Sequence, residues 1–201
     1  FLCEMGLDPG IDHMSAMQLI HRIQKDGGKI TSFHSHCGGL IAPESDNNPW
    51  HYKISWNPRN IVLAGKAGAV YKSEGRIIYL PYELLFDENR TIEVAGEGLY
   101  AWYPNRDAVS YSKLYGLENC DTFIRTTLRH PDFCLGWKKI VELKLTDEDK
   151  RYDTANLSYV SFLKQHLAHH RLTDDATPKQ KMLLSYLGLY SNEVIDKGLL
   201  T

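Results

Sequence analysis

The spacing of apolar residues divides the chain into a mixed first part and a helical last part. In residues 11–25 the apolar side chains fall mostly on one helical stripe that ends at a Gly-Gly pair, which predicts an amphipathic helix. Residues 29–37 alternate between two sets of side chains, as a strand with differently occupied faces does. Residues 38–49 are rich in Gly, Pro, Asn and Ser and predict a loop, followed by a short extended run at 51–56.

Short elements separated by turns are predicted for the next stretch of the chain. They are a short helix at 59–68, hairpin strands at 69–72 and 76–82, a loop and strand at 93–103, a helix at 107–115 and a strand at 121–128. Strands and helices therefore alternate in the first two thirds of the sequence.

Beyond Pro131 the apolar spacing becomes helical throughout. It predicts helices at 133–143, 154–170, 178–190 and, shorter, 191–197. The polar stretch TDEDKRYD at 146–153 separates most of this part from the rest. We therefore predict an α+β fold, with a mixed sheet flanked by helices in residues 1–146 and a small all-helical subdomain in residues 147–201.

Charge and cysteine content exclude several classes of protein. The formal net charge is −2 and no basic stripe is present, so we expect no nucleic-acid binding. No apolar run approaches the roughly 18 residues of a membrane span, so we expect no membrane partner. The four cysteines are far apart and form no CxxC pair, which favours reduced thiols in a cytosol-like compartment.

The stretch GLDPGIDHM, residues 6–14, is the strongest local signal for chemistry. Pro9 fixes φ and Gly10 permits a sharp bend just before the first predicted helix. Such a turn can aim backbone amides and the Asp8 carboxylate at a ligand. Asp12 is predicted as the N-cap of this helix, and the alternative is an ordinary helix start in which the turn only precedes that cap.

Histidines and a cysteine on the second predicted element raise the question of a metal. His34 and His36 would share one face of the strand, but no third ligand stands at a recognisable spacing, so we predict no metal site. Cys37 lies at the strand end before Gly38-Gly39, where its thiol could face a pocket. No base for a nucleophilic cysteine is evident, and a buried neutral thiol is the alternative.

Arginines in YPNRD and RTTLR indicate affinity for carboxylates. Arg106, Arg125 and Arg129 stand beside a predicted helix start and at a predicted strand end. A guanidinium binds a carboxylate through two parallel hydrogen bonds, so a substrate with several carboxylates would need such groups. Surface ion pairs with Asp107 or Asp121 are the alternative.

Several motifs together resemble those of one known family. They are CEMGLDPGIDHM at 3–14, CGGL and APES with NNP between 37 and 49, YKISW at 52–56, YPNRD at 103–107 and TLR at 127–129, with Ile41 where many relatives have Pro. In this order they resemble the saccharopine dehydrogenase family, and within it the glutamate-forming saccharopine reductases of lysine metabolism. The part after residue 131 resembles the family only in being helical.

The resemblance implies a reversible hydride transfer. In that family saccharopine, NAD or NADP, and water give 2-aminoadipate 6-semialdehyde and glutamate through an imine. The resemblance implies catalytic roles for Asp8 and Cys37. It implies that the nicotinamide lies beside Leu7, Asp8, Pro9 and Trp56. It also implies that the carboxylates of saccharopine are bound by Arg106, Thr127, Leu128 and Arg129. A homodimer is also implied. There are two alternatives. One is a related enzyme that acts on a lysine or carboxynorspermidine-type substrate, and the other is a non-catalytic dimerisation module.

The sequence departs from the family in one respect. Family members begin with a Rossmann domain whose GxGxxG loop binds the pyrophosphate, whereas Gly96 and Gly98 here lack the third glycine and the strand–turn–helix context. We therefore expect these 201 residues to be the substrate-binding and dimerisation portion of a larger enzyme, inactive alone. NAD or NADP would be bound mainly by a Rossmann domain absent from this chain. The expected compartment is the cytoplasm, or the mitochondrial matrix if the parent is a bifunctional eukaryotic enzyme.

Overall fold

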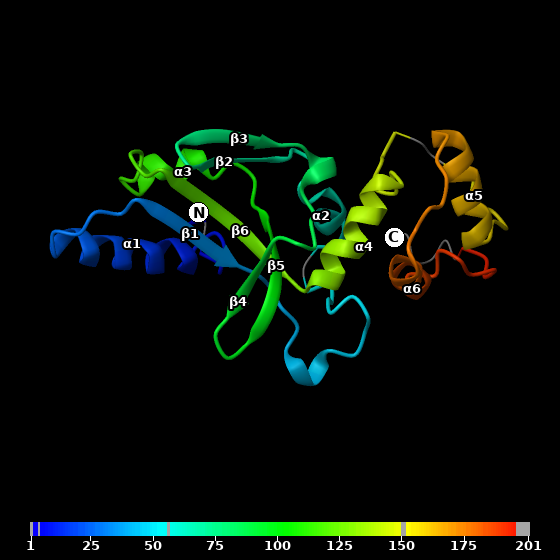
Figure 1. The fold of residues 1–201 in the computed structure, drawn as a ribbon. Coiled ribbons are helices and arrows are strands. Elements are labelled where there is room, and N and C mark those ends of the chain that lie inside the picture. The colour runs from blue at the N-terminus through cyan, green and yellow to red at the C-terminus, as the bar shows by residue number, and fades with distance from the viewer. Residues whose placement is uncertain (1, 4, 56, 150–151, 196–201) are drawn as a thin grey trace.

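A computed structural model gives the structure of residues 2–3, 5–55, 57–149 and 152–195, which Figure 1 shows as a ribbon. Its centre is a 6-stranded sheet whose middle strand is β6 (Thr122–Arg129). The strand β1 (Ser32–Cys37) runs parallel to β6 along one edge. Along the other edge β6 pairs antiparallel first with β2 (Ala69–Ser73) and then with β5 (Gly98–Pro104). The sheet is therefore mixed.

Two hairpins complete the sheet. β2 continues into β3 (Arg76–Leu80) through the predicted turn, and β4 (Thr91–Val94) pairs antiparallel with β5. Gly96 and Gly98 belong to this second hairpin, so they are part of a strand connection and not of a phosphate-binding loop.

Helices pack against the sheet and follow it. They are α1 (Ile11–Lys25), α2 (Pro58–Leu63), α3 (Val109–Leu114), α4 (Pro131–Glu142), α5 (Tyr159–His170) and α6 (Pro178–Tyr186), with short 3-10 turns η1 (Pro43–Ser45) and η2 (Tyr82–Leu84). In Figure 1, α1 runs beside β1, whereas α4 separates the sheet from α5 and α6. A mixed sheet with flanking helices and further helices at the end of the chain confirms the predicted fold class.

One face of the sheet carries both hydrophobic clusters. Phe33 of β1 pairs with Phe123 of β6, and these rings stack at one end beneath α1 and α3. Tyr103 of β5 pairs with Thr127 of β6 and lies at the other end, toward α4. Because residues paired across strands point to the same face, both clusters lie on one side and leave a space between them.

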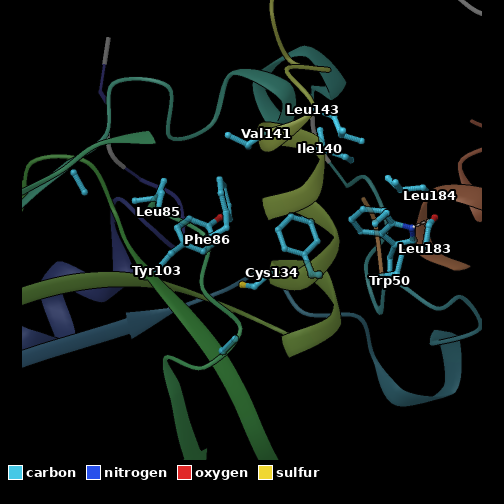
Figure 2. Packing of buried hydrophobic residues seen from close by; sticks show 14 residues of the cluster. Trp50, Leu85, Phe86, Tyr103, Cys134, Ile140, Val141, Leu143, Leu183 and Leu184 are labelled. Carbon is cyan, nitrogen blue, oxygen red and sulfur yellow. Dashed lines mark hydrogen bonds between the residues drawn. The ribbon is translucent and has the colours of Figure 1, made fainter. Parts of the chain in front are cut away.

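The larger cluster is centred on α4. Figure 2 shows Phe86, Tyr103 and Cys134 between the sheet and α4, and Trp50 on the opposite side of α4 with Leu183 and Leu184. The indole Nε1–H of Trp50 donates to the carbonyl oxygen of Leu183 at 2.9 Å. The loop before α2 is thereby fixed to both α4 and α6.

Several predicted elements differ in length from those observed. The helix predicted at 59–68 ends at Leu63, because Gly65 adopts φ 85° and the chain turns. The helix predicted at 154–170 begins only at Tyr159, with Ser158 as its N-cap. The helix predicted at 191–197 is wrong for the described residues 191–195, where Val194 instead forms a β-bridge with Ser158.

The division predicted at residue 146 stays a prediction. Leu183 and Leu184 of α6 share one hydrophobic cluster with Trp50 and with residues of α4.

Within the described ranges, the structure contains no helix long and apolar enough to cross a membrane.

Candidate functional site

A cavity of about 560 Å³ occupies the space between the two hydrophobic clusters, above the sheet. Strand residues with alternating spacing line it, since Arg125, Thr127 and Arg129 of β6 point to the same face. Seven of the residues predicted for the site also line it, namely Leu7, Asp8, Pro9, Cys37, Arg106, Thr127 and Arg129. The structure thus brings together residues from the first turn, β1, β6 and the segment after β5.

The turn before α1 places two carboxylates beside the cavity. Gly10 has φ 151° and ψ −96°, a conformation that a side chain would disfavour, and it is the N-cap of α1. The prediction that Asp12 is the N-cap is therefore wrong, because the helix begins at Ile11. Asp12 lies in the first turn, and its Oδ1 accepts the backbone N–H of Gly10 at 2.9 Å.

Arg125 joins these two carboxylates. Its Nη2 donates to Asp8 Oδ1 at 2.6 Å and to Asp12 Oδ2 at 2.8 Å. The three side chains are 6%, 16% and 7% exposed for Arg125, Asp8 and Asp12, so these ion pairs are shielded from water. The guanidinium also lies 4.2 Å above the ring centre of Tyr111 in α3. One cation on β6 therefore fixes the turn to the sheet.

The pKa values in this network follow from burial and pairing. Burial favours the neutral form of Asp12, but the hydrogen bonds from Arg125 and Gly10 and the neighbouring positive charge outweigh it, so the pKa of Asp12 lies below its ordinary value. Burial likewise disfavours the charged Arg125, but the hydrogen bond to Asp12 and the charges of Asp8 and Asp12 raise the pKa of Arg125. Both groups are charged at neutral pH.

Asp8 has one further partner. The side-chain amide of Asn105, in the YPNRD segment, donates to Asp8 Oδ2 at 3.2 Å. Each oxygen of the carboxylate thus has its own donor, and the group lines the cavity in a fixed orientation.

Arg129 has surroundings of a different kind. It is 9% exposed, and its Nη1 donates to the carbonyl oxygen of the preceding residue at 2.8 Å. Its guanidinium lies 5.1 Å and 5.5 Å from the ring centres of Tyr52 and Phe133. Among the described residues no carboxylate pairs with it, and its Nε is buried without a hydrogen-bond partner. A buried cation without an anion in a cavity is suited to an anionic ligand.

Arg106 is the exposed arginine of the cavity. It follows β5 with φ 49°, a left-handed conformation, and its backbone carbonyl oxygen accepts the N–H of Val70 at 2.8 Å. In the described part of the chain its side chain forms no ion pair with Asp107 or Asp121, the partners considered in the alternative. Its guanidinium therefore also has no carboxylate partner within the described chain.

Thr127 and Leu128 are separated by strand geometry. Thr127 lines the cavity, whereas Leu128, which was predicted to bind substrate, is not among the lining residues. Successive side chains of a strand point to opposite faces, which explains the difference. The backbone of Leu128 lies so close to Gly38 that a Cβ on Gly38 would come within 2.4 Å of the Leu128 carbonyl oxygen.

Cys37 lies at the end of β1 and lines the cavity. Burial raises the pKa of its thiol, and the negative charges of Asp8 and Asp12 raise it further, against the effect of Arg125 and Arg129. The neutral thiol is therefore the dominant form, and a thiolate nucleophile is disfavoured.

Other predicted residues lie elsewhere. Trp56, predicted beside the nicotinamide, is outside the described residues. His34 and His36 lie on the face of the sheet opposite the cavity, and Nδ1 of His36 is hydrogen-bonded to Oγ1 of Thr126 at 2.7 Å. A separate group of potential metal ligands, His51, His130 and Asp132, lies near the N-terminus of α4.

Sequence analysis identified Arg125 only as a general candidate and missed Asn105 altogether. The period of two along RTTLR would have placed Arg125 on the same face as Arg129. The spacing of Asp8 and Asp12 at a helix start would have indicated that these two acids lie near each other. No sequence signal connects Asn105 with Asp8, since 97 positions separate them.

Comparisons with known proteins agree with this architecture. A family model described as the saccharopine dehydrogenase C-terminal domain matches residues 6–186. An alpha-aminoadipic semialdehyde synthase of Arabidopsis thaliana is 42% identical over 151 residues, which cover 74% of this chain and 14% of that protein. A saccharopine dehydrogenase [NADP(+), L-glutamate-forming] of Saccharomyces cerevisiae is 37% identical over 165 residues, covering 82% of this chain and 37% of the yeast protein.

A solved structure gives the same result for the fold. The apo saccharopine dehydrogenase (L-Glu forming) of Saccharomyces cerevisiae superposes with a TM-score of 0.80 at 32% identity, over 96% of this chain and 47% of the yeast chain. The chain thus spans less than half the length of these relatives. Since the family model covers most of the sequence, the chain belongs to the saccharopine dehydrogenase C-terminal domain family.

Proposed function

We propose that this chain is the substrate-binding portion of an NAD(P)-dependent saccharopine dehydrogenase of the L-glutamate-forming type. The reaction would interconvert saccharopine with 2-aminoadipate 6-semialdehyde and glutamate. The observation that carries the proposal is Arg129, a buried cation in the cavity that has no carboxylate partner among the described residues. The membership of the family agrees with it.

The substrate carboxylates would occupy the arginine side of the cavity. Saccharopine carries three carboxylates, and Arg129 and Arg106 are the two guanidinium groups of the cavity without a carboxylate partner among the described residues. The hydroxyl of Thr127, on the same face of β6 as Arg129, would add a hydrogen bond. We leave Leu128 out of the proposed site, because its side chain does not line the cavity.

A nicotinamide would occupy the opposite side of the cavity. Leu7 and Pro9 supply apolar surface there, with the Asp8 carboxylate between them, so a planar and positively charged ring would be matched in shape and charge. NAD or NADP would supply the hydride chemistry, and its pyrophosphate would need a binding loop that the glycines of the β4–β5 hairpin do not form.

Asp8 and Cys37 would assist the reaction without forming a covalent bond. When the carbon bonded to the neutral secondary amine of saccharopine loses a hydride, which the oxidised NAD or NADP would accept, the carbon–nitrogen bond becomes a positively charged iminium, to which water then adds. Asp8, held by Arg125 and Asn105, would stabilise that positive charge electrostatically. The neutral Cys37 thiol would donate a hydrogen bond in the same cavity.

Steady-state kinetics of the full-length enzyme test the carboxylate assignment. We expect Arg129→Met to raise the KM for saccharopine by about 100-fold, because an anion loses its buried partner. Arg106→Gln should raise it less, since Arg106 is exposed. Arg76→Gln, at an exposed arginine of β3 outside the cavity, is the matched control. Unchanged KM values in both cavity variants would show that the carboxylates bind elsewhere.

The assembly and compartment are also proposals. We infer a homodimer from the resemblance, and light scattering of the full-length protein measures it directly. A cytoplasmic location remains the expectation from the cysteine pattern, with the mitochondrial matrix as the alternative.

A further inference from the structure

A second cluster of polar side chains lies beside the N-terminus of α4, outside the cavity. His51, His130 and Asp132 each present one potential metal ligand, and these atoms all lie within 4.8 Å of one another. The imidazole rings of His51 and His130 have centroids 3.8 Å apart at an interplanar angle of 33°. None of the three residues lines the cavity.

The geometry points to a binding site for a late first-row divalent metal ion, with Zn²⁺ as the representative ion, formed by His51, His130 and Asp132. Two imidazoles and one carboxylate are a donor set that such ions prefer. Ligands of a tetrahedral zinc site lie roughly 3.4 Å apart at bond lengths near 2.1 Å, so small side-chain rotations would close the site. All three residues are partly exposed, which leaves the ion access from solvent.

His51 has a second-sphere partner of the kind found at metal sites. Its Nδ1 lies 2.5 Å from Oδ2 of Asp46, and a carboxylate accepts the hydrogen there. That bond fixes the tautomer and leaves the lone pair of Nε2 available. The Asp46 and Asp132 carboxylates together balance the two charges of a divalent ion.

The segment that carries His51 is held rigidly in place. The Oδ1 of Asn48, a residue 8% exposed, accepts the N–H of Trp50 at 3.0 Å, and its Nδ2 donates to the carbonyl oxygen of Tyr52 at 3.1 Å. His51 itself has φ 48°, a left-handed conformation that a non-glycine residue adopts at a cost. A histidine at a position that favours glycine accepts this conformational cost, which suits a role for its imidazole.

The other two ligands are placed by the helix start. His130 is the N-cap of α4, and its Nδ1 accepts the N–H of Asp132 at 3.2 Å, so this nitrogen carries a lone pair. The ion would replace that long hydrogen bond. The ammonium group of Lys179 contacts Asp132 and is the competing cation, but its side chain is 54% exposed and free to move away.

Two substitutions remove the imidazoles while preserving the backbone. His51→Gly suits φ 48°, so we expect no loss of stability. His130→Asn retains an N-cap acceptor for the N–H of Asp132. Thermal unfolding of the metal-free variants verifies that each one folds.

Metal binding is measured on the full-length protein after chelator treatment, in a Cys3→Ser background that removes an exposed thiol. Zn²⁺ affinity is obtained by competition with a chromophoric chelator, and Co²⁺ absorption reports the coordination geometry. We expect one ion at this site, an affinity loss of about 10-fold in Asp46→Asn, and a greater loss in His51→Gly and His130→Asn.

A variant with the opposite expected effect sharpens the test. Lys179→Met removes the competing cation and should tighten Zn²⁺ binding. His169→Gln, in another pair of neighbouring histidines at the end of α5, is the matched control and should leave the affinity unchanged. Absence of Zn²⁺ binding to the Cys3→Ser protein, or unchanged affinity in His51→Gly and His130→Asn, would overturn the proposal.

Discussion

Arg125 and Arg129 lie four residues apart on the same face of β6, yet their surroundings are opposite. Arg125 donates to two carboxylates and stacks on an aromatic ring. Arg129 is comparably buried, contacts two aromatic rings, and has no carboxylate partner in the described chain. The same side chain thus stabilises the fold at one end of the cavity and is available for a ligand at the other.

The difference shows that two buried arginines of one strand can have opposite effects on the stability of the free protein. A buried ion pair is sensitive to loss of one partner, since the remaining charge is then uncompensated. A buried cation without an anion costs stability in the free protein but increases the gain on binding an anion. Each arginine should therefore respond differently to the same substitution.

The largest effect is expected for Arg125→Met. The carboxylates of Asp8 and Asp12, which are 16% and 7% exposed, would lose their shared cation and repel each other. We expect the free energy of unfolding to fall by about 3–5 kcal/mol, measured by urea denaturation. The double variant Arg125→Met/Asp12→Asn should recover part of this loss. If the single variant is as stable as the wild type, the two ion pairs do not hold the turn to the sheet.

Arg129→Met should have a smaller and opposite effect on stability. The methionine retains apolar contact with Tyr52 and Phe133, and the unpaired buried charge disappears. We expect the free energy of unfolding to rise by about 1 kcal/mol. If Arg129→Met instead lowered the free energy of unfolding as much as Arg125→Met, Arg129 would have a structural role like that of Arg125.

Whether the sequence could predict these surroundings depends on how far apart the interacting residues are along the chain. Alternation along β6 is a local property, so the placement of Thr127 and Arg129 on one face follows from the sequence. The resemblance nevertheless grouped Leu128 with them, although the same alternation turns its side chain away from the cavity. The hairpin of β2 and β3 was predictable from another local feature, the turn residues Ser73, Glu74 and Gly75 between the two strands.

Interactions between distant segments were not predictable in the same way. The N-cap of α1 was assigned to Asp12 because aspartate is common there, but Arg125, 113 positions away, binds this carboxylate instead. The segment 191–195 has helical spacing, yet it bridges Ser158 because tertiary pairing satisfies its backbone. The proximity of His51 and His130 likewise depends on the packing of a loop against α4.

The Arg125 region should also respond to acid. The pKa of Asp12 in the folded protein lies below its ordinary value of 3.8, so the unfolded chain takes up a proton first as the pH falls. The stabilisation from Asp12 is therefore complete above about pH 5 and is lost as the pH falls through the folded pKa. We expect the stability difference between wild type and Asp12→Asn to shrink between neutral pH and about pH 3 in urea titrations. A difference independent of pH would exclude the ion pair as its cause.

The smallest effect concerns Cys37, whose thiol is influenced by the charges around both Arg125 and Arg129. The charges of Asp8 and Asp12 raise the pKa of its thiol, whereas those of Arg125 and Arg129 lower it. Alkylation requires the thiolate, so Asp8→Asn should accelerate iodoacetamide labelling of Cys37 by about threefold and Arg129→Met should slow it similarly. Mass spectrometry of the labelled peptides gives both rates, with the exposed Cys3 as internal reference. Equal labelling rates in the two variants would mean that burial alone sets the reactivity of Cys37, and that the charges around Arg125 and Arg129 do not affect the thiol at the end of β1.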